Sequence, residues 1–340
     1  MTIRQSLLII DLGSGYIKCG TPGLSLPKVF PACYPMKKGY SQNKRLLELD
    51  PGRADWAFPL ESGILPKKSK NLTPLCELAF SESQSDLPDR SKIKLLLLLF
   101  PLMKTEQVTS FCKELKEELD CLHVTAAIQQ VLTWCYWGKK SSIIVDIGYT
   151  ASFITPIYRG FLITEHIKPL ITGSFFVSAA LRHLILNKAK QSSASERDAL
   201  TQIAMDGEAI DFIKKTLCRV ISNPEKTQLS SKDSHYHRGD VDISLGRIPE
   251  EANEVLFDPT LLGVGDYGIV GALAEVLDNV DATVRSELAS NIVLAGGGAM
   301  VPGLRQRIRT ELKRHMPYLN IRVYDLEKPM YSAWLGAASM

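Results

Sequence analysis

The hydrophobic pattern of the chain repeats one arrangement at two distant places. The stretches "LLIIDLGSGYIKCG" at 7–20 and "SSIIVDIGYTASFIT" at 141–155 each begin with a short apolar run that ends in an aspartate, Asp11 or Asp146, and continue through glycine into a second apolar run. Two short apolar runs joined by a glycine turn predict a β-hairpin. The sequence therefore predicts two hairpins that each carry a carboxylate at the turn.

Alternating strands and helices are expected around these hairpins. The run "LLLLLF" at 95–100 is apolar at every position, which is typical of a strand buried on both faces of a mostly parallel sheet. At 104–122, Val108, Phe111, Leu115 and Leu119 recur at helical spacing, so an amphipathic helix is expected there. Further helices are expected at 74–80, 126–137, 173–189, 196–221, 269–277 and 304–315, strands at 291–294 and 320–324, and irregular polar or proline-broken segments at 22–59, 81–92 and 223–247.

This order of elements predicts an internally duplicated α/β protein with a cleft between its halves. We expect a first lobe over residues 1–137, with a small outer lobe at 32–58, and a second lobe over 138–340, with an outer lobe at about 172–264. Open α/β sheets bind ligands at the carboxyl ends of their strands, where Asp11 and Asp146 would lie.

Composition narrows the function classes. Of the 340 residues, 40 are basic and 37 acidic, and the resulting charge of +3 is too small to indicate nucleic acid or an anionic membrane as the main partner. The 7 cysteines are scattered without a C-x-x-C pair, which favours reduced thiols over a zinc site or a disulfide framework. The paired histidines of "DSHYHRGD" have no third ligand nearby, so a solvated loop is the better interpretation. The apolar run at 95–100 is too short to cross a bilayer, and we expect no membrane insertion.

The two hairpins have the chemistry of a polyphosphate site. Glycines such as Gly13, Gly15 and Gly148 let backbone N–H groups approach phosphate oxygens without interference from Cβ. Lys18 lies close enough beyond the first turn to reach back to a phosphate as a point charge. One or two carboxylates plus phosphate oxygens suit a hydrated Mg²⁺ ion. A third glycine turn, "LAGGGAMVPG" at 294–303, is placed to pass a base or ribose.

Together these motifs resemble the actin family, within the superfamily of actin, Hsp70 and the sugar kinases. "DLGSGYIKCG" is similar to the family's first phosphate loop, and "AIQQVLTWCYWGKKSSIIVDIGYTASFITPIYRG" to its connecting helix, second phosphate loop and following strand. "NIVLAGGGAMVPGLRQRI" resembles its adenosine loop and "YSAWLGAAS" its late strand and helix junction. The resemblance runs from end to end in order, and it implies the duplicated, ribonuclease H-like fold of an actin-like ATPase.

The resemblance also implies individual roles. Asp11 and Asp146 would hold Mg²⁺ through water, and Gln129 would position an attacking water. The positions expected to contact ATP or ADP are Gly13, Ser14, Gly15, Lys18, Gly148, Gly173, Lys214, Gly297, Gly298 and Met300.

Four positions depart from the family pattern. Phe153 stands where the family has a histidine that helps to relay protons, and a phenyl ring neither accepts nor donates a proton. Tyr149 replaces an acidic residue, Lys215 a ribose-binding glutamate, and Met330 a lysine beside the adenine. We therefore expect Mg-ATP or Mg-ADP to be bound without efficient hydrolysis, because general-base chemistry needs a titratable group within reach.

The resemblance further implies a non-polymerising structural subunit. The segment between Pro31 and Pro59 is shorter than the family's small outer lobe, and the chain stops at Met340, before the helices that complete the family's barbed-end groove. We expect a cytoplasmic, cytoskeletal protein that caps the pointed end of the actin-like minifilament of dynactin, with other actin or actin-related subunits and pointed-end proteins as partners.

Two alternatives remain open. One is a nuclear actin-related subunit of a chromatin-remodelling complex, which would tolerate the same departures in the cleft. The other is a small-metabolite kinase of the same superfamily, which would need a further catalytic carboxylate in the cleft.

Overall fold

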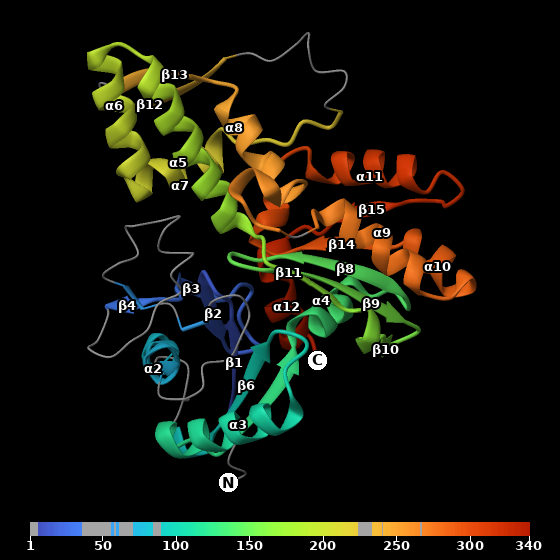
Figure 1. The fold of residues 1–340 in the computed structure, drawn as a ribbon. Coiled ribbons are helices and arrows are strands. Elements are labelled where there is room, and N and C mark those ends of the chain that lie inside the picture. Colours follow the sequence, from blue (N-terminus) through green and yellow to red (C-terminus); the bar gives the residue numbers. More distant parts are fainter. Residues whose placement is uncertain are drawn as a thin grey trace.

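A computed structural model describes residues 6–35, 56–57, 59–60, 71–83, 90–223, 233–239, 241–265 and 267–340. Two β-sheets form the centres of two lobes (Figure 1), with the first sheet in the lower part of that view and the second above it. Each sheet begins with one of the two hairpins that the sequence predicts. The duplicated α/β fold with two lobes is thereby confirmed.

The first sheet has the strand order β3-β2-β1-β6-β7. Strand β1 pairs antiparallel with β2 and parallel with β6, which pairs parallel with β7. The leucine run lies in β6, between two parallel neighbours, as its continuous apolar pattern predicts. The bounds are β1 Ser6–Leu12, β2 Tyr16–Gly20, β3 Lys28–Pro31, β6 Ile93–Leu99 and β7 His123–Ile128.

The second sheet repeats this topology in the order β10-β9-β8-β14-β15. Strand β8 pairs antiparallel with β9 and parallel with β14, and β15 extends the parallel side. The short strands β10 and β11 both pair with β9 and together take the place that β3 has in the first sheet. The bounds are β8 Ser142–Ile147, β9 Ser152–Tyr158, β10 Phe161–Leu162, β11 Lys168–Leu170, β14 Ile292–Ala295 and β15 Val323–Asp325.

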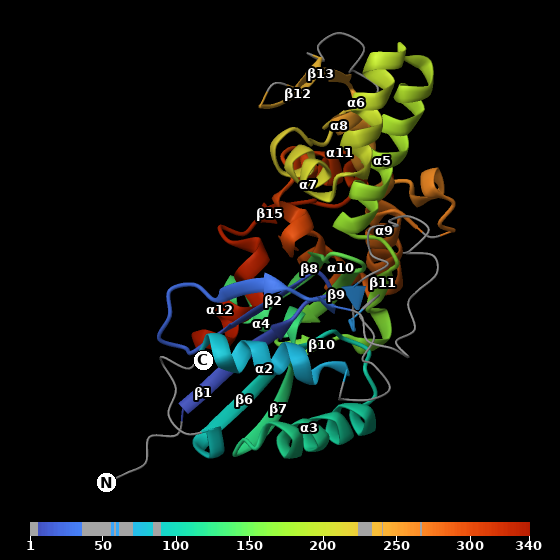
Figure 2. The ribbon, with the colours of Figure 1, turned by 90° about the vertical axis from the view of Figure 1, so that its left-hand side faces the viewer.

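Strand alternation sends apolar side chains to both faces of the first sheet. Leu8 and Ile10 join the core beneath helices α2 (Thr73–Glu82) and α3 (Thr105–Leu119), whereas Ile9 faces α4 (Gln129–Trp137) and α12 (Ser332–Ala338). Helix α3 buries Phe111, Leu115 and Leu119, as its spacing predicts. Figure 2 shows α2 and α3 beside the strands β1, β6 and β7.

The second sheet is covered in the same way. Ile144 and Val293 face α4 on one side. Ile143 and Leu294 lie on the other face, in the core made with helices that follow β11. The helices of this half of the chain are α5 Ser174–Gln191, α6 Ala194–Met205, α7 Gly207–Thr216, α8 Ile248–Glu251, α9 Ile269–Asn279, α10 Ala282–Ala289 and α11 Leu304–His315. The described 3₁₀ segments are Arg90–Lys92, Thr164–His166, Ala252–Leu256, Pro259–Leu262, Gly297–Met300 and Pro329–Tyr331.

Several sequence-based boundaries were wrong. The helix expected at 126–137 begins only at Gln129, because the preceding residues form strand β7 against β6. The helix expected at 196–221 is two helices, since Asp206 is extended and caps α7 through Glu208 N–H. Part of the polar segment at 223–247 is a hairpin, β12 (Ser234–Arg238) with β13 (Val241–Gly246), and Lys28–Pro31 is an edge strand of the first sheet.

The proposed outer lobe at 32–58 lies mostly outside the described residues. Its described ends pair as β4 (Tyr34–Pro35) and β5 (Trp56–Ala57). For the proposed outer lobe at about 172–264, Figure 1 shows α5, α6, α7, β12 and β13 gathered beyond the second sheet. In the part of the chain that the structure describes, no helix has the length and apolar character needed to cross a membrane.

Helices α4 and α12 connect the two sheets. Helix α4 runs from the last strand of the first sheet to the first strand of the second, and α12 packs against both α4 and β1. Trp334 of α12 is fully buried, and Thr133 Oγ1 lies 3.0 Å from Ser332 Oγ across the helix pair. A Cβ on Gly336 would lie 1.9 Å from the backbone oxygen of Leu132, so the two helix backbones approach as only glycine allows.

This close approach predicts that Gly336→Ala destabilises the protein. The added methyl group meets backbone atoms rather than a flexible side chain, so the helices must separate, and overpacking of this kind costs about 1–3 kcal/mol of unfolding free energy. Urea unfolding followed by circular dichroism measures the loss. Gly23→Ala is the matched control, because no atom lies within 4 Å of a Cβ at that position. Equal stabilities of the two variants would contradict the proposed packing.

Candidate functional site

Period-two alternation places both aspartates on the inner faces of their sheets. Asp11 shares a face of β1 with Ile9, and Asp146 shares a face of β8 with Ile144. Both faces are packed against α4. The two carboxylates therefore approach one helix from two sheets.

Two consecutive glutamines at the start of α4 bind these carboxylates. Gln129 Nε2 donates to Asp11 Oδ1 at 2.7 Å, and Gln130 Nε2 donates to Asp146 Oδ2 at 2.6 Å. Successive helix residues project about 100° apart, so one helical turn can serve both sheets. Gln129 Nε2 is also within hydrogen-bond distance of the backbone oxygens of Leu12, at 3.1 Å, and Leu98, at 3.3 Å. The amide of Gln129 is thus fixed by three oxygens of the first lobe.

Asp11 has a second, charged partner. In the register of the first hairpin Asp11 lies directly opposite Lys18, and Lys18 Nζ is 2.9 Å from Asp11 Oδ2. Asp11 is only 2% exposed, and the opposite charge of Lys18 offsets part of the cost of burying its carboxylate. Lys18 thereby lines the site as the partner of Asp11, and its contact with a phosphate stays a prediction.

Asp146 has a raised pKa. Burial raises its pKa to about 6, and the nearby Asp11 carboxylate acts in the same direction, whereas Lys18 and the hydrogen bond from Gln130 oppose the rise. At neutral pH the buried Asp146 carboxylate therefore destabilises the folded state, and a cation beside it would reduce that destabilisation.

The glycines of the hairpins are required by close backbone approach. A Cβ on Gly13 would lie 2.6 Å from the backbone oxygen of Tyr16, and one on Gly148 would lie 2.6 Å from that of Ala151. In the third loop Gly296 has φ +80°, and a Cβ there would lie 2.4 Å from Asp146 Oδ1. These close approaches explain why the turns need glycine, and Gly13, Gly148 and Gly296 all line the cleft.

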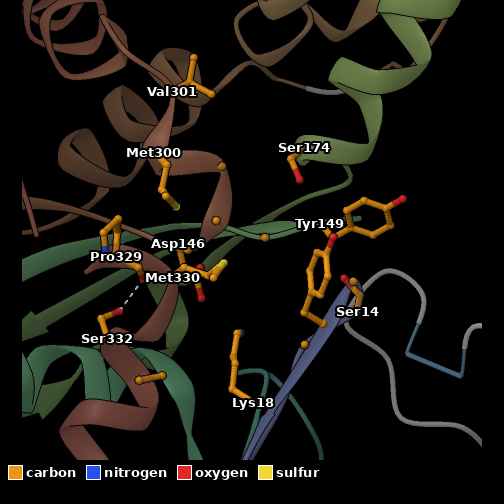
Figure 3. A pocket seen from close by; sticks show the side chains of 18 of the residues that line it. Ser14, Lys18, Asp146, Tyr149, Ser174, Met300, Val301, Pro329, Met330 and Ser332 are labelled. Carbon is orange, nitrogen blue, oxygen red and sulfur yellow. Dashed lines mark hydrogen bonds between the residues drawn. The ribbon is translucent and has the colours of Figure 1, made fainter. Parts of the chain in front are cut away.

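These elements enclose a cleft of about 530 Å³ between the lobes. Figure 3 shows Lys18 pointing into it, with Met300 and Met330 on one wall and Ser14 and Tyr149 on the other. All but one of the residues expected to contact nucleotide, magnesium or the attacking water line this cleft: Asp11, Gly13, Ser14, Gly15, Lys18, Gln129, Asp146, Gly148, Lys214, Gly297, Gly298 and Met300. Gly173 is the exception, because a Cβ there would lie 2.5 Å from the backbone oxygen of Tyr149, beneath the second hairpin.

Sequence reasoning missed other parts of the lining. Gly296 follows the strand β14 directly, and the run of three glycines was a usable signal for it. Tyr16, Val301 and Pro302 also line the cleft and lie within the glycine motifs, although no role was assigned to them. Further lining residues that no motif marks are Val29, Ser174, Val177, Leu256 and Pro329. Gln130 belongs to the motif "AIQQ", but only the fold reveals that its amide binds Asp146.

Three of the four residues that differ from the family pattern contact other residues at or near the cleft. Phe153 is 4% exposed and stacks on Phe100 with ring centroids 5.7 Å apart. Lys215 Nζ is 2.5 Å from Asp211 Oδ2. The side chain of Met330 lies 3.9 Å from the position of a Cβ on Gly297.

Lys214 is held within the cleft by several contacts. Its Nζ donates to Ser178 Oγ at 2.9 Å, lies 3.3 Å from Asp211 Oδ1, and is 5.7 Å from the centroid of the Tyr149 ring. Burial lowers the pKa of Lys214, against the opposing effect of Asp211. The ammonium group therefore lines the cleft from the second lobe, opposite the first hairpin.

No protein-only metal site accompanies these residues. Among the residues that the structure describes, no three histidine, cysteine or acidic side chains come close enough together to hold a metal ion. His235 is paired with Asp242, with 3.3 Å between Nδ1 and Oδ1, on the β12–β13 hairpin. A metal ion in the cleft would accordingly need oxygen atoms from a ligand or water beside Asp11 and Asp146.

A duplicated α/β fold, with a glycine-lined cleft between its sheets and an aspartate from each sheet at the floor, defines the class of actin-like proteins. The family model for actin matches residues 3–340. The chain therefore belongs to the actin family.

The raised pKa of Asp146 predicts how stability changes with pH. The folded-state pKa, about 6, exceeds the ordinary value of 3.8, so the folded chain binds the proton more tightly than the unfolded chain. The contribution of Asp146 to unfolding free energy therefore rises as pH falls from about 7 toward about 4. Asp146→Asn should stabilise the ligand-free protein by about 1–3 kcal/mol at pH 7.5, and by less at pH 5.

Urea unfolding at both pH values, with nucleotide and magnesium removed, measures this difference. Asp198→Asn, at an exposed position of α6, is the matched control and should keep the wild-type pH dependence. A stability difference between Asp146→Asn and wild type that does not change with pH would contradict the assignment.

Proposed function

We propose that the cleft holds Mg-ATP or Mg-ADP, and that the nucleotide contacts both lobes and so acts as a structural pin that holds them together. The observation that carries this proposal is the pair of glycine hairpins that bring Asp11 and Asp146 to one helix turn beside Lys18. The residues fit the ligand, because the turns at Gly13 and Gly148 line the cleft beside Lys18 and the carboxylates suit hydrated Mg²⁺. A bound magnesium ion would neutralise charge on phosphates and on the two aspartates.

The other predicted contacts are assigned by position. Ser14, Gly15 and Lys18 would bind phosphates from the first lobe, and Lys214 of the second lobe would contact the ribose and base end. Gly297, Gly298 and Met300 would line the ribose and base end. Gly173 would act only indirectly, by supporting the backbone of the second hairpin.

Hydrolysis is disfavoured by the environment of the expected attacking water. The amide nitrogen of Gln129 is engaged by Asp11 and by two backbone oxygens, so only its amide oxygen could hold a water. Phe153 and Phe100 form an apolar stack where a proton relay would be needed. We propose that nucleotide serves the structure of the protein and is not consumed.

We further propose that the protein is a non-polymerising actin-related subunit. Its proposed place is the pointed end of dynactin's actin-like minifilament, in the cytoplasmic cytoskeleton, with actin-related subunits and pointed-end proteins as partners. Support comes from membership of the actin family, from the resemblance of its motifs, and from a cleft built to retain a ligand. Mass spectrometry of proteins that co-purify with the tagged native chain tests this role.

The same experiment distinguishes the alternatives. Dynactin subunits in the purified material would support the proposed role. A chromatin-remodelling ATPase would instead place the protein in the nucleus. A small-metabolite kinase would release ADP in the presence of its substrate, and the described cleft offers no observation in favour of that reaction.

The pin proposal predicts stabilisation by nucleotide. Mg-ADP at about 100 times its dissociation constant should add about 2.7 kcal/mol to the unfolding free energy and raise the melting temperature. Asp11→Asn should reduce that rise, because the variant loses a magnesium carboxylate and the charge that orients Lys18. Differential scanning fluorimetry with and without Mg-ADP measures both shifts. Asp242→Asn is the control and should respond as wild type does. If Mg-ADP does not raise the melting temperature of the wild-type protein, the proposal that nucleotide pins the lobes is refuted.

The proposal also predicts negligible ATP turnover. Released phosphate, followed over hours in the presence of excess Mg-ATP, should not exceed the amount of protein. Steady phosphate release at the rate of a polymerising actin would contradict the assigned role of Phe153.

A further inference from the structure

The end of the cleft where the two hairpins meet is filled by the side chain of Tyr149. A Cβ built on Gly15 would lie 2.6 Å from Cγ and 2.7 Å from Cβ of Tyr149. The side chain of Tyr149 is thus seated on the bare backbone of Gly15, across the gap between the lobes. Figure 3 shows Tyr149 beside Ser14 at this end of the cleft.

The Tyr149 ring is held from the second lobe. The Phe175 ring meets it edge-on, with centroids 5.7 Å apart and an interplanar angle of 73°. Lys214 Nζ lies 5.7 Å from its centroid, within the range of a cation–π contact. The backbone of Tyr149 is fixed as well, because Phe175 N–H donates to its oxygen at 2.8 Å and Gly173 packs against that oxygen.

A direct hydrogen bond joins the two hairpins beside the ring. Thr150 N–H donates to Ser14 Oγ at 3.2 Å, and both residues are at least 95% buried. A backbone N–H and a serine hydroxyl at facing glycine turns are the donors that a terminal phosphate would otherwise use. Here the Thr150 N–H is taken up by Ser14 Oγ, so a phosphate that used this N–H would have to displace both the hydrogen bond and the ring.

We infer that the cleft selects a nucleoside diphosphate, and that Tyr149 is the specificity-determining residue that excludes the third phosphate. The inference rests on the proposed nucleotide site and states which ligand that site takes. The open part of the cleft, with Lys18 and both aspartates at its floor, accommodates the shorter ligand. Because Tyr149 is neutral, it excludes the terminal phosphate by volume and by closing the hairpins, and charge repulsion plays no part.

Isothermal titration of the full chain, stripped of nucleotide, with Mg-ADP and separately with Mg-ATP tests this inference. Wild type should bind Mg-ADP at least about tenfold more tightly than Mg-ATP, a readily measured difference. Tyr149→Ala should bind Mg-ATP more tightly than wild type does and so reduce the ratio toward one. Tyr149→Phe, which keeps the ring, should retain the discrimination. Phe161→Ala, at a position 78% exposed on β10, is the control outside the cleft.

The outcomes separate this inference from the proposed function. Equal wild-type affinities for the two nucleotides would overturn the diphosphate preference and leave the nucleotide site intact. Discrimination that persists in Tyr149→Ala would overturn the role of Tyr149. Binding of neither nucleotide would refute the proposed function itself. Should Tyr149→Ala fail to fold, chromatography of nucleotide released from the wild-type chain after incubation with equal, saturating concentrations of Mg-ADP and Mg-ATP still decides, because retention of as much ATP as ADP would contradict the preference.

Discussion

The structure depends on one helical turn that satisfies two carboxylates at once. Gln129 binds Asp11 of the first sheet and Gln130 binds Asp146 of the second. The start of α4 is therefore hydrogen-bonded to both sheets. Both carboxylates lie at buried hairpin turns, where unpaired charge is costly. The close crossing of α4 with α12 then holds this helix between the lobes. The cleft exists where it does because the two sheets meet at these residues.

Local pattern was sufficient for the hairpins and for most helices. A buried strand that ends in Asp-x-Gly has few alternatives, and its second occurrence along the chain is enough to predict the duplication. Pattern failed at 126–128, where alanines favour a helix but pairing of β7 with β6 decides the strand. It failed again at Asp206, because a cap between two short helices leaves the apolar spacing nearly unchanged.

The sequence predicts which residues line the site, but it does not predict which of them contact each other. Carboxylates, glycines and Lys18 follow from short motifs, and all of them except Gly173 line the cleft. The pairing of Gln130 with Asp146 and the seat of Tyr149 on Gly15 join different lobes or distant segments, and spacing along the chain carries no information about them. For Gly173 the sequence suggested a contact with the ligand. The structure instead shows that glycine is needed there because its backbone packs closely against the second hairpin.

The central claim is that a nucleotide pins the two lobes through both hairpins together. Amide hydrogen exchange of the full chain, with and without saturating Mg-ADP, tests it most directly, since exchange reports local opening. The account predicts that the ligand slows exchange in both hairpins, at 6–20 and 142–158, and at the start of α4. Slower exchange in only one hairpin, or in neither, would contradict a ligand held between the lobes.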